Sequence, residues 1–549
     1  MPLAQIVNQG SINLAALVTP GVIVVIVPPP LYGQPQPTDT GCVLGTASWG
    51  KCNVPYLMGS TGDLNYDFGG INGMVSYNDA HDLCEQANIA FMQANGQQSS
   101  LQIFGIRISD GTDVAATVAL KDTTSGSALT GGTATAICTG VFGNQIKITF
   151  TTGNLPNTIN ATITAQFRGN RPEAFLNIPC SAGANTNFWT NFANALANGT
   201  SQRGPSQFIT LANPSATAMP PALGTFTLAN GTDGRGSVTS ANFIGQNSQN
   251  GLNTGAYAMQ GVVPSVNQFW CAGLVDNTVY ATLQSIADTL GAGTFLNMTK
   301  GLSTADAITL IQTIGIIDYN VSYVSGDYLF WYDPVNGMQR LQEATPFLAG
   351  RILTLSPEQS PGNKYVQGVT GSLRNSVQGG NQPYTEAELG QLTTYGILTV
   401  CNPINRGNAW GIFHGKNSSQ VSNPVTGKIE YARMTNYLAK SYAAIMGAFV
   451  DELQSDDPDD ELRAAVKLAA DTLCEALKRN KQIDAYANTC DQNLNTKMSV
   501  AMGYLYLQSE VRYLASADFI VIELMGGVTE LGALQVVAQV SPKTTQAAA

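Results

Sequence analysis

Two histidines, His81 and His414, are the only imidazoles that this 549-residue sequence offers for acid–base or metal chemistry. Neither has a second histidine at ligand spacing. His81 and Cys84 are three residues apart, a spacing found more often on an ordinary helix than at a metal site. The histidines therefore predict neither a metal centre nor a proton-transfer site.

Motifs for nucleophilic or phosphoryl chemistry are also missing. The sequence contains no G-x-S-x-G, no H-E-x-x-H and no G-x-G-x-x-G between a strand and a helix. Gly415-Lys416 resembles the end of a phosphate loop, but Trp410 and Asn417 stand where that loop needs glycine and a hydroxyl residue. Aspartates beside glycine, such as Asp233, are typical of turns, and no spacing selects a carboxylate pair for glycosidase chemistry. We therefore expect no enzyme activity, no catalytic residue, no cofactor and no bound metal.

Nine cysteines are scattered along the chain without a C-x-x-C pair. Their odd number favours mostly free thiols, as in a protein kept in a reducing compartment. Disulfides between subunits are the alternative, because Cys42 and Cys52 lie close behind an apolar segment near the N-terminus.

Composition excludes several classes of protein. Charged residues make up 11% of the chain, under half of the usual value of about 25%, and the net charge is −11. A nucleic-acid surface needs excess Lys and Arg, so direct binding to DNA or RNA is not expected. No run of about 18 apolar residues predicts a membrane span, and the opening MPLAQIVNQG lacks the basic region of a secretory signal. We expect a protein made in a cytoplasm that meets other proteins over large areas.

The N-terminal apolar segment predicts a strand between two prolines, because its residues are all β-branched. One face would carry Val22, Val24 and Ile26, and the other would carry Ile23, Val25 and Val27. Both faces are apolar and must be covered. The segment is either a central strand of its own domain or an arm that adds to the sheet of another subunit.

Further elements alternate between strand and helix patterns. Residues 42–47 and 101–108 (LQIFGIRI) predict buried strands, and Leu83, Ala87, Ala90 and Phe91 form a helical stripe between them. Residues from about 111 to 240 are rich in Thr, Ala, Gly and Asn, and their short alternating stretches (145–150 and 158–163) predict a β-rich insertion. Residues 255–345 return to an α/β pattern, with a helical stripe around Leu283 and an aromatic strand at 328–332.

The last third carries the strongest helix patterns. One stripe runs from Met434 to Leu453. A second helix is expected to begin with Asp457 as its cap and Pro458 as its first residue. Strand-like runs follow this second helix, and their apolar residues are Phe519, Ile520, Val521, Ile522, Leu534, Val536 and Val540.

Seven segments, in order, resemble the contractile tail sheath proteins of phages and related injection machines. They are residues 19–24 (TPGVIV), 45–55 (GTASWGKCNVP), 142–148 (FGNQIKI), 231–234 (GTDG), 346–351 (PFLAGR), 486–496 (YANTCDQNLNT) and 519–522 (FIVI). Two family stretches differ here. Residues 353–364 read LTLSPEQSPGNK, and residues 410–414 only loosely match.

The resemblance implies a multidomain α/β (α+β mixed) fold with strand arms at both termini. Residues 1–35 would form the N-terminal arm, residues 36–345 the outer domains with the insertion at 111–240, residues 346–515 the inner tube-facing domain, and residues 516–549 the C-terminal arm. The arm strands, Val22 to Val27 and the apolar residues after 516, would add to sheets of neighbouring subunits.

The implied function is that of a structural subunit. Copies would polymerise as a helical cylinder around a tail tube, contact baseplate and tail terminator proteins, and contract to drive the tube through a host envelope during genome delivery. The expected location is the virion, after assembly in the cytoplasm of a host bacterium. The alternatives are a sheath of a bacterial injection system or pyocin and, from another class, a secreted β-rich enzyme or adhesin.

Overall fold

The computed structural model describes residues 35–71, 79–95, 100–123, 129–168, 172–180, 187–248, 251–376, 380–423, 426–522 and 524, and the backbone of two strands near the N-terminus. Those strands are β1 (Gln5–Asn8) and β2 (Ile23–Ile26), which pair in parallel. The chain forms two units, Met1–Leu514 and Ala515–Ala549. No helix in the described part is long and apolar enough to cross a membrane.

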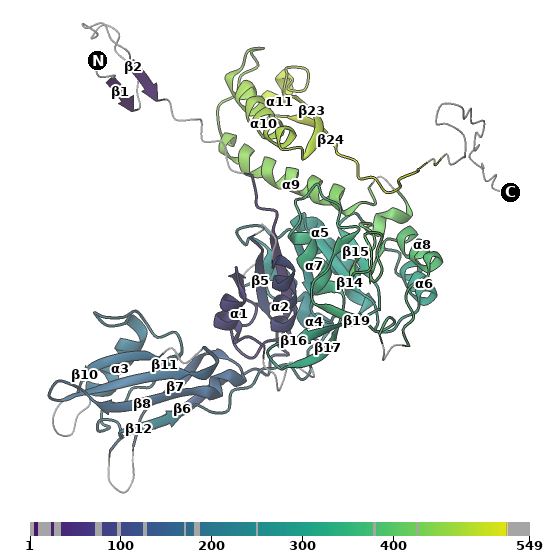
Figure 1. Ribbon diagram of the computed structural model, residues 1–549. Helices are drawn as coiled ribbons and strands as arrows, with labels where there is room; N and C mark the ends of the chain where they lie inside the picture. Colours follow the sequence, from purple (N-terminus) through teal and green to yellow (C-terminus); the bar gives the residue numbers. More distant parts are fainter. Residues whose placement is uncertain are drawn as a thin grey trace, which may run out of the picture. The chain divides into compact units, whose positions relative to one another are not determined.

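A seven-stranded sheet organises the first unit (Figure 1). Its order is β20 (Ile397–Leu398), β15 (Val321–Val324), β14 (Gly293–Asn297), β13 (Gln268–Cys271), β3 (Thr40–Gly45), β5 (Gln102–Arg107) and β4 (Pro55–Met58). All neighbours are parallel except β4, which runs antiparallel to β5. The strands predicted at 42–47 and 101–108 are confirmed as β3 and β5.

Helices cover both faces of this sheet, as a parallel sheet requires. One face packs against α1 (Thr61–Phe68), α2 (Leu83–Ala94) and α7 (Thr345–Leu353). The other packs against α5 (Tyr280–Leu290), α6 (Thr304–Ile314) and α8 (Glu386–Thr394). The predicted helical stripes are confirmed in α2 and α5. Asp82 caps α2, because its Oδ1 accepts a hydrogen bond from the Glu85 amide at 2.7 Å.

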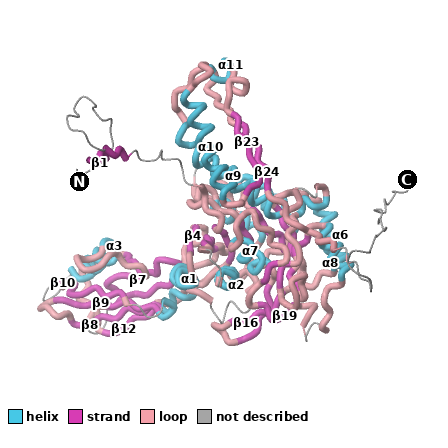
Figure 2. The backbone as a smooth tube through the Cα atoms, turned by 45° about the horizontal axis from the view of Figure 1, so that its top comes forward, coloured by secondary structure: helices cyan, strands magenta, loops and turns pink. Residues whose placement is uncertain are grey.

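The β-rich segment forms two sheets around a shared core (Figure 2). One sheet is β10 (Glu173–Pro179), β9 (Thr158–Ala165), β8 (Ile146–Thr152) and β12 (Gly224–Thr227), and the other is β11 (Ile209–Ala212), β7 (Thr130–Thr139) and β6 (Ala115–Lys121). Helix α3 (Asn187–Asn198) packs into the same core, and α4 (Ser240–Ile244) follows. Burial alternates along β9, as the pattern at 158–163 predicts.

Two small sheets lie in the second half of this unit. They are β17 (Met338–Gln342), β16 (Leu329–Asp333) and β19 (Val369–Ser372), and β18 (Lys364–Tyr365), β22 (Gly411–Ile412) and β21 (Val400–Cys401). The aromatic strand predicted at 328–332 is confirmed as β16. Helix α7 and strand β20 pack in the same hydrophobic cores as strands that precede residue 345. The core is therefore continuous across position 346, where the inner domain was predicted to begin.

A separate core begins at α9 (Ile429–Met446). It includes α10 (Glu461–Arg479), β23 (Ile483–Thr489) and β24 (Gln508–Tyr513), and α11 (Lys497–Ala501) lies between the strands in sequence. Two predicted helix limits are wrong here. Helix α9 ends at Met446 and a 3-10 turn follows over Gly447–Phe449. The chain then becomes extended at Val450 and Asp451 takes a φ of 65°, so the helix does not reach Leu453, which is 93% exposed.

The second helix begins later than predicted. Its cap is Asp460, whose Oδ2 accepts from the Arg463 amide at 3.0 Å. The carbonyl of Asp457 instead accepts a hydrogen bond from the Arg463 guanidinium, so this aspartate and Pro458 lie before the helix. Glu461 lies in the first turn of α10 and Lys478 and Arg479 in its last turn, the arrangement of charges that a helix dipole favours.

Candidate assembly surface

The carboxyl ends of parallel strands are where α/β proteins usually place a ligand site. In this chain, polar side chains near that edge bond to one another. Glu343 Oε1 accepts from Gln86 Nε2 at 2.5 Å and from the Gly273 amide at 2.7 Å, and Gln86 Oε1 accepts from Trp270 Nε1 at 3.2 Å. All three side chains are buried. This edge is therefore a closed hydrogen-bond network, and its polar groups stabilise the packing of α2 on the sheet.

A second buried group lies beside the first. Arg340 pairs with Glu85 at 2.5 Å and with Asp333 at 3.3 Å, and Glu85 also accepts from Trp331 Nε1 at 3.2 Å. Burial raises the pKa of Glu85 to about 8 and that of Glu343 to about 7. In Glu85 the Arg340 charge opposes this shift, but desolvation is the larger effect.

Glu343 should make stability depend on pH. The folded pKa of about 7 exceeds the ordinary value of 4.5, so the folded chain binds this proton more tightly than the unfolded chain. The resulting stability is complete below pH 4.5 and is lost as pH rises through 7. In Glu343→Gln, which keeps an acceptor for Gln86, we expect the loss of unfolding free energy between pH 4.5 and pH 8 to shrink by about 2–3 kcal/mol. Urea titrations at both pH values measure this.

The exposed Glu452 provides the matched control, as Glu452→Gln removes the same carboxylate from a solvated position. Its pH profile should match that of the unmodified chain. An unchanged profile for Glu343→Gln would show that Glu343 does not exchange its proton in this pH range.

Two arginines tie the β-rich segment to the sheet. Arg107, the last residue of β5, is fully buried and donates to the carbonyls of Gly50 at 2.6 Å, Thr139 at 2.7 Å and Asp233 at 2.9 Å. Because Thr139 ends β7 and Asp233 follows β12, one guanidinium bonds to two parts of the segment that are distant in sequence.

The second arginine, Arg235, is in contact with a cluster of carboxylates. It lies 2.7 Å from Asp79, 3.1 Å from Asp233 and 3.5 Å from Asp82, and it donates to Ser48 Oγ at 3.0 Å. Three anions share one cation in a largely buried site, so removing the cation would leave uncompensated charge.

The core formed by α9, α10, β23 and β24, here called the C-terminal core, contains a two-stranded sheet, β23–β24. Figure 2 shows it beside α10, and no third strand pairs with it among the residues that the structure describes. Tyr486, Val511 and Tyr513 pack one face onto the α9–α10 core. Neither outer edge has a ladder partner in the described part of the chain, and a two-stranded sheet of this kind is a template for strand addition.

The second unit is described at residues 515–522 and at 524. These residues take no regular secondary structure, and their apolar side chains are 79–90% exposed: Phe519, Ile520, Val521, Ile522 and Leu524. Such a contiguous apolar run at the surface is typical of an interaction segment.

The sequence-predicted arm residues fall in three groups. Ile23, Val24, Val25 and Ile26 form β2. Phe519, Ile520, Val521 and Ile522 are exposed but are not a strand within this chain. Val22, Val27, Leu534, Val536 and Val540 lie outside the described residues. Their pairing with a neighbouring subunit stays a prediction.

The cysteines are free thiols within the chain. Cys42 is fully buried in β3, and burial raises its pKa well above the usual range. Cys52 is half-buried, with its Sγ 3.3 Å from Asp113 Oδ2, so it is the more accessible of the two candidates for a disulfide between subunits. That pairing also stays a prediction.

Sequence reasoning missed the open sheet and both arginines. Tyr486, Val511 and Tyr513 carry the alternation of a half-buried strand, but polar residues around them weaken it. Asp233 was predicted in a turn, but the turn forms at Gly236 and Ser237, after Gly234 with its φ of 64°. Its carboxylate nevertheless pairs with Arg235, two residues later.

Comparison with solved structures finds the same arrangement of elements in sheath proteins. A sheath tail protein from Listeria innocua matches with a TM-score of 0.58 and 12% identity, over 88% of this chain and 96% of that one. A sheath tail protein from Desulfitobacterium hafniense matches with a TM-score of 0.53 and 15% identity, over 86% and 94%. The chain has the sheath-protein fold.

A third sheath structure extends this finding. The contracted helical sheath of the anti-feeding prophage matches with a TM-score of 0.50 and 11% identity, over 93% of this chain and the whole of that one. No family model and no curated protein matches the sequence. The predicted mixed α/β multidomain sheath-protein fold is thus confirmed, and it spans nearly all of each sheath chain.

Proposed function

We propose that this protein is the structural, non-enzymatic subunit of a contractile sheath. The observation that carries the proposal is the likeness to sheath chains over 94–100% of their length. Copies would polymerise into a helical cylinder around a tail tube, bounded by baseplate and terminator proteins. Of the two possible settings, a phage tail and a bacterial injection system, we propose the phage tail, with the virion as its location.

Strand exchange would hold the cylinder together. The two open edges of β23–β24 are the acceptors, and the donors are the N-terminal strand and the exposed apolar run after residue 516. Backbone hydrogen bonds of an added strand would satisfy the edge, and the apolar side chains would leave water. The proposed tube-facing part is residues 346–515, and residues 36–345, including the β-rich segment, would decorate the outside.

Electron microscopy of the purified, expressed protein tests assembly. Long cylinders are the expected result. Monodisperse monomers under all conditions would favour the alternative of a β-rich enzyme or adhesin.

Contraction should need no nucleotide. The sequence offers no phosphate loop, and two packings of one interface can store the required free energy. We expect extended particles, purified and freed of ATP, to contract on mild heat, acid or denaturant, as seen by electron microscopy. Contraction that required added ATP would contradict the proposal that the interface between subunits stores the free energy of contraction.

A further inference from the structure

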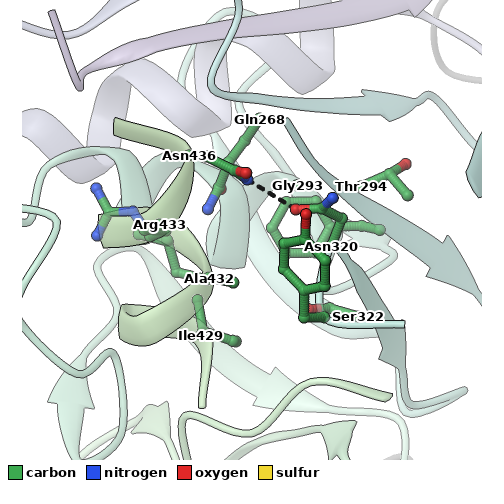
Figure 3. Close-up of a pocket in the computed structure, with 12 residues that line it drawn as sticks. Gln268, Gly293, Thr294, Asn320, Ser322, Ile429, Ala432, Arg433 and Asn436 are labelled. Atoms are coloured by element: carbon green, nitrogen blue, oxygen red, sulfur yellow. Dashed lines mark hydrogen bonds between the residues drawn. The ribbon is translucent and has the colours of Figure 1, made fainter. Parts of the chain in front are cut away.

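A small cavity lies between helix α9 and the amino ends of β13, β14 and β15 (Figure 3). Its volume is about 20 Å³. A water molecule needs roughly 10–15 Å³ measured in this way, so the cavity has room for water but not for a metabolite. Helix α9 contributes Ala432, Arg433 and Asn436 to its lining.

One lining side chain is a buried polar group without a partner. Gln268, the first residue of β13, is only 2% exposed, and its Oε1 has no hydrogen-bond partner within the described part of the chain. An unpaired buried amide oxygen is destabilising, because it has lost its hydrogen bonds to water. Buried polar atoms of this kind are commonly paired with ordered water.

The hollow exists because its floor is a glycine. In the register of the sheet, Gly293 of β14 stands next to Gln268. A Cβ added at Gly293 would meet Gln268 Cγ at 3.5 Å and the Asn320 carbonyl oxygen at 3.8 Å, which are ordinary contacts. Gly293 is not among the described residues with positive φ. Its missing side chain therefore provides space rather than backbone freedom.

Other polar groups surround this space. Asn436 Nδ2 donates to Asn320 Oδ1 at 2.7 Å, as the dashed line in Figure 3 shows. Asn320 Nδ2 in turn donates to Asp288 Oδ1 at 2.9 Å. The cavity is also lined by Ser322 and Arg433. A water molecule here would find the two to four polar partners that an ordered site requires.

We propose that this cavity binds one ordered water molecule that donates a hydrogen bond to Gln268 Oε1 and joins the sheet to helix α9. The same face of α9 is held by polar contacts on both sides. Arg433 donates to the Leu355 carbonyl at 2.7 Å, and Lys440 Nζ donates to the Val266 carbonyl at 2.6 Å. The water adds a further polar contact to those that Arg433 and Lys440 make along α9. This inference does not depend on the proposed sheath function.

A high-resolution experimental map of the protein is the direct test. Where other buried waters are resolved, we expect a peak in this cavity within hydrogen-bond distance of Gln268 Oε1. A map that resolves other buried waters and shows no peak here overturns the proposal.

The sign of a substitution gives a second test. Gly293→Ala places a methyl group where the water sits and leaves Gln268 unpaired, so we expect Tm to fall by about 1–3 °C. In the Gln268→Met background no acceptor is left unpaired, and the same substitution should raise Tm.

The Thr40→Val background is the matched control. Thr40 Oγ1 is also buried without a partner but does not line the cavity, so Gly293→Ala should lower Tm there as in the unmodified chain. A Gly293→Ala substitution that raised Tm in every background would mean that the cavity is dry.

Discussion

Removing residues 516–549 is expected to leave a folded monomer that no longer forms cylinders. The described apolar residues of this segment are 79–90% exposed, and the first unit ends at Leu514. The described part of the segment therefore contributes almost no buried apolar surface to the first unit. It removes the proposed donor strand from every contact between subunits.

The size of the effect follows from strand addition. An added strand of six residues gains several hydrogen bonds, each worth about 0.5–1.5 kcal/mol net. Apolar burial adds about 25 cal/mol per Å². The gross gain is on the order of 5–10 kcal/mol per arm before ordering entropy is subtracted. Because each subunit repeats this contact, its loss should abolish assembly.

Circular dichroism and electron microscopy together measure the result. Deleting residues 1–28, or replacing Val24 and Ile26 with aspartate, should give the same outcome, because a buried unpaired carboxylate is costly. An insoluble or unfolded truncated chain would show that these strands belong to their own chain's core. Normal cylinders from the truncated chain would contradict both interpretations of the arms.

The parts of the fold that were predicted from sequence are those with a regular burial pattern, either complete as in β3 or alternating as in β9. Strands β3 and β5 are apolar on both faces. The spacing of Leu83, Ala87 and Ala90 fits the period of a helix and not that of a strand. These patterns depend on local spacing. Helix limits were less predictable: residues 456–461 (DDPDDE) offer several caps, and the contact of Arg463 with the Asp457 carbonyl decides among them.

Of the candidate assembly surface, only the donor segments could be predicted from the sequence. Apolar donor segments such as Val24 and Ile26 are conspicuous in sequence because nothing local covers them. The acceptor is not, since an open sheet edge is made of backbone groups that every residue carries. Likewise, nothing in the sequence around Arg107 or Arg235 names the groups that each arginine contacts. Their role comes from folding together segments more than a hundred residues apart, such as the Arg235 contact with Asp79.

Replacing Arg235 with methionine is expected to lower the free energy of unfolding by about 3–5 kcal/mol. The guanidinium is the shared partner of Asp79, Asp82 and Asp233, whose side chains are at most 10% exposed. Methionine fills much of the same volume but leaves three carboxylates without a cation. Since Asp233 follows β12 and Asp82 caps α2, the junction of the β-rich segment with the sheet should weaken first.

An exposed ion pair offers the matched control. Arg512 lies 2.5 Å from Asp484, with the arginine side chain 72% exposed. Such pairs contribute about 0–1 kcal/mol, so Arg512→Met should change stability little. Urea titration of both variants, with hydrogen exchange at Val141 to report on the junction, separates the two cases. The Val141 amide donates to Asp233 Oδ1 at 2.5 Å, so its protection should fall in Arg235→Met alone. Equal losses for the two arginines would mean that the buried cluster contributes no more than a surface pair, and that packing alone holds the junction.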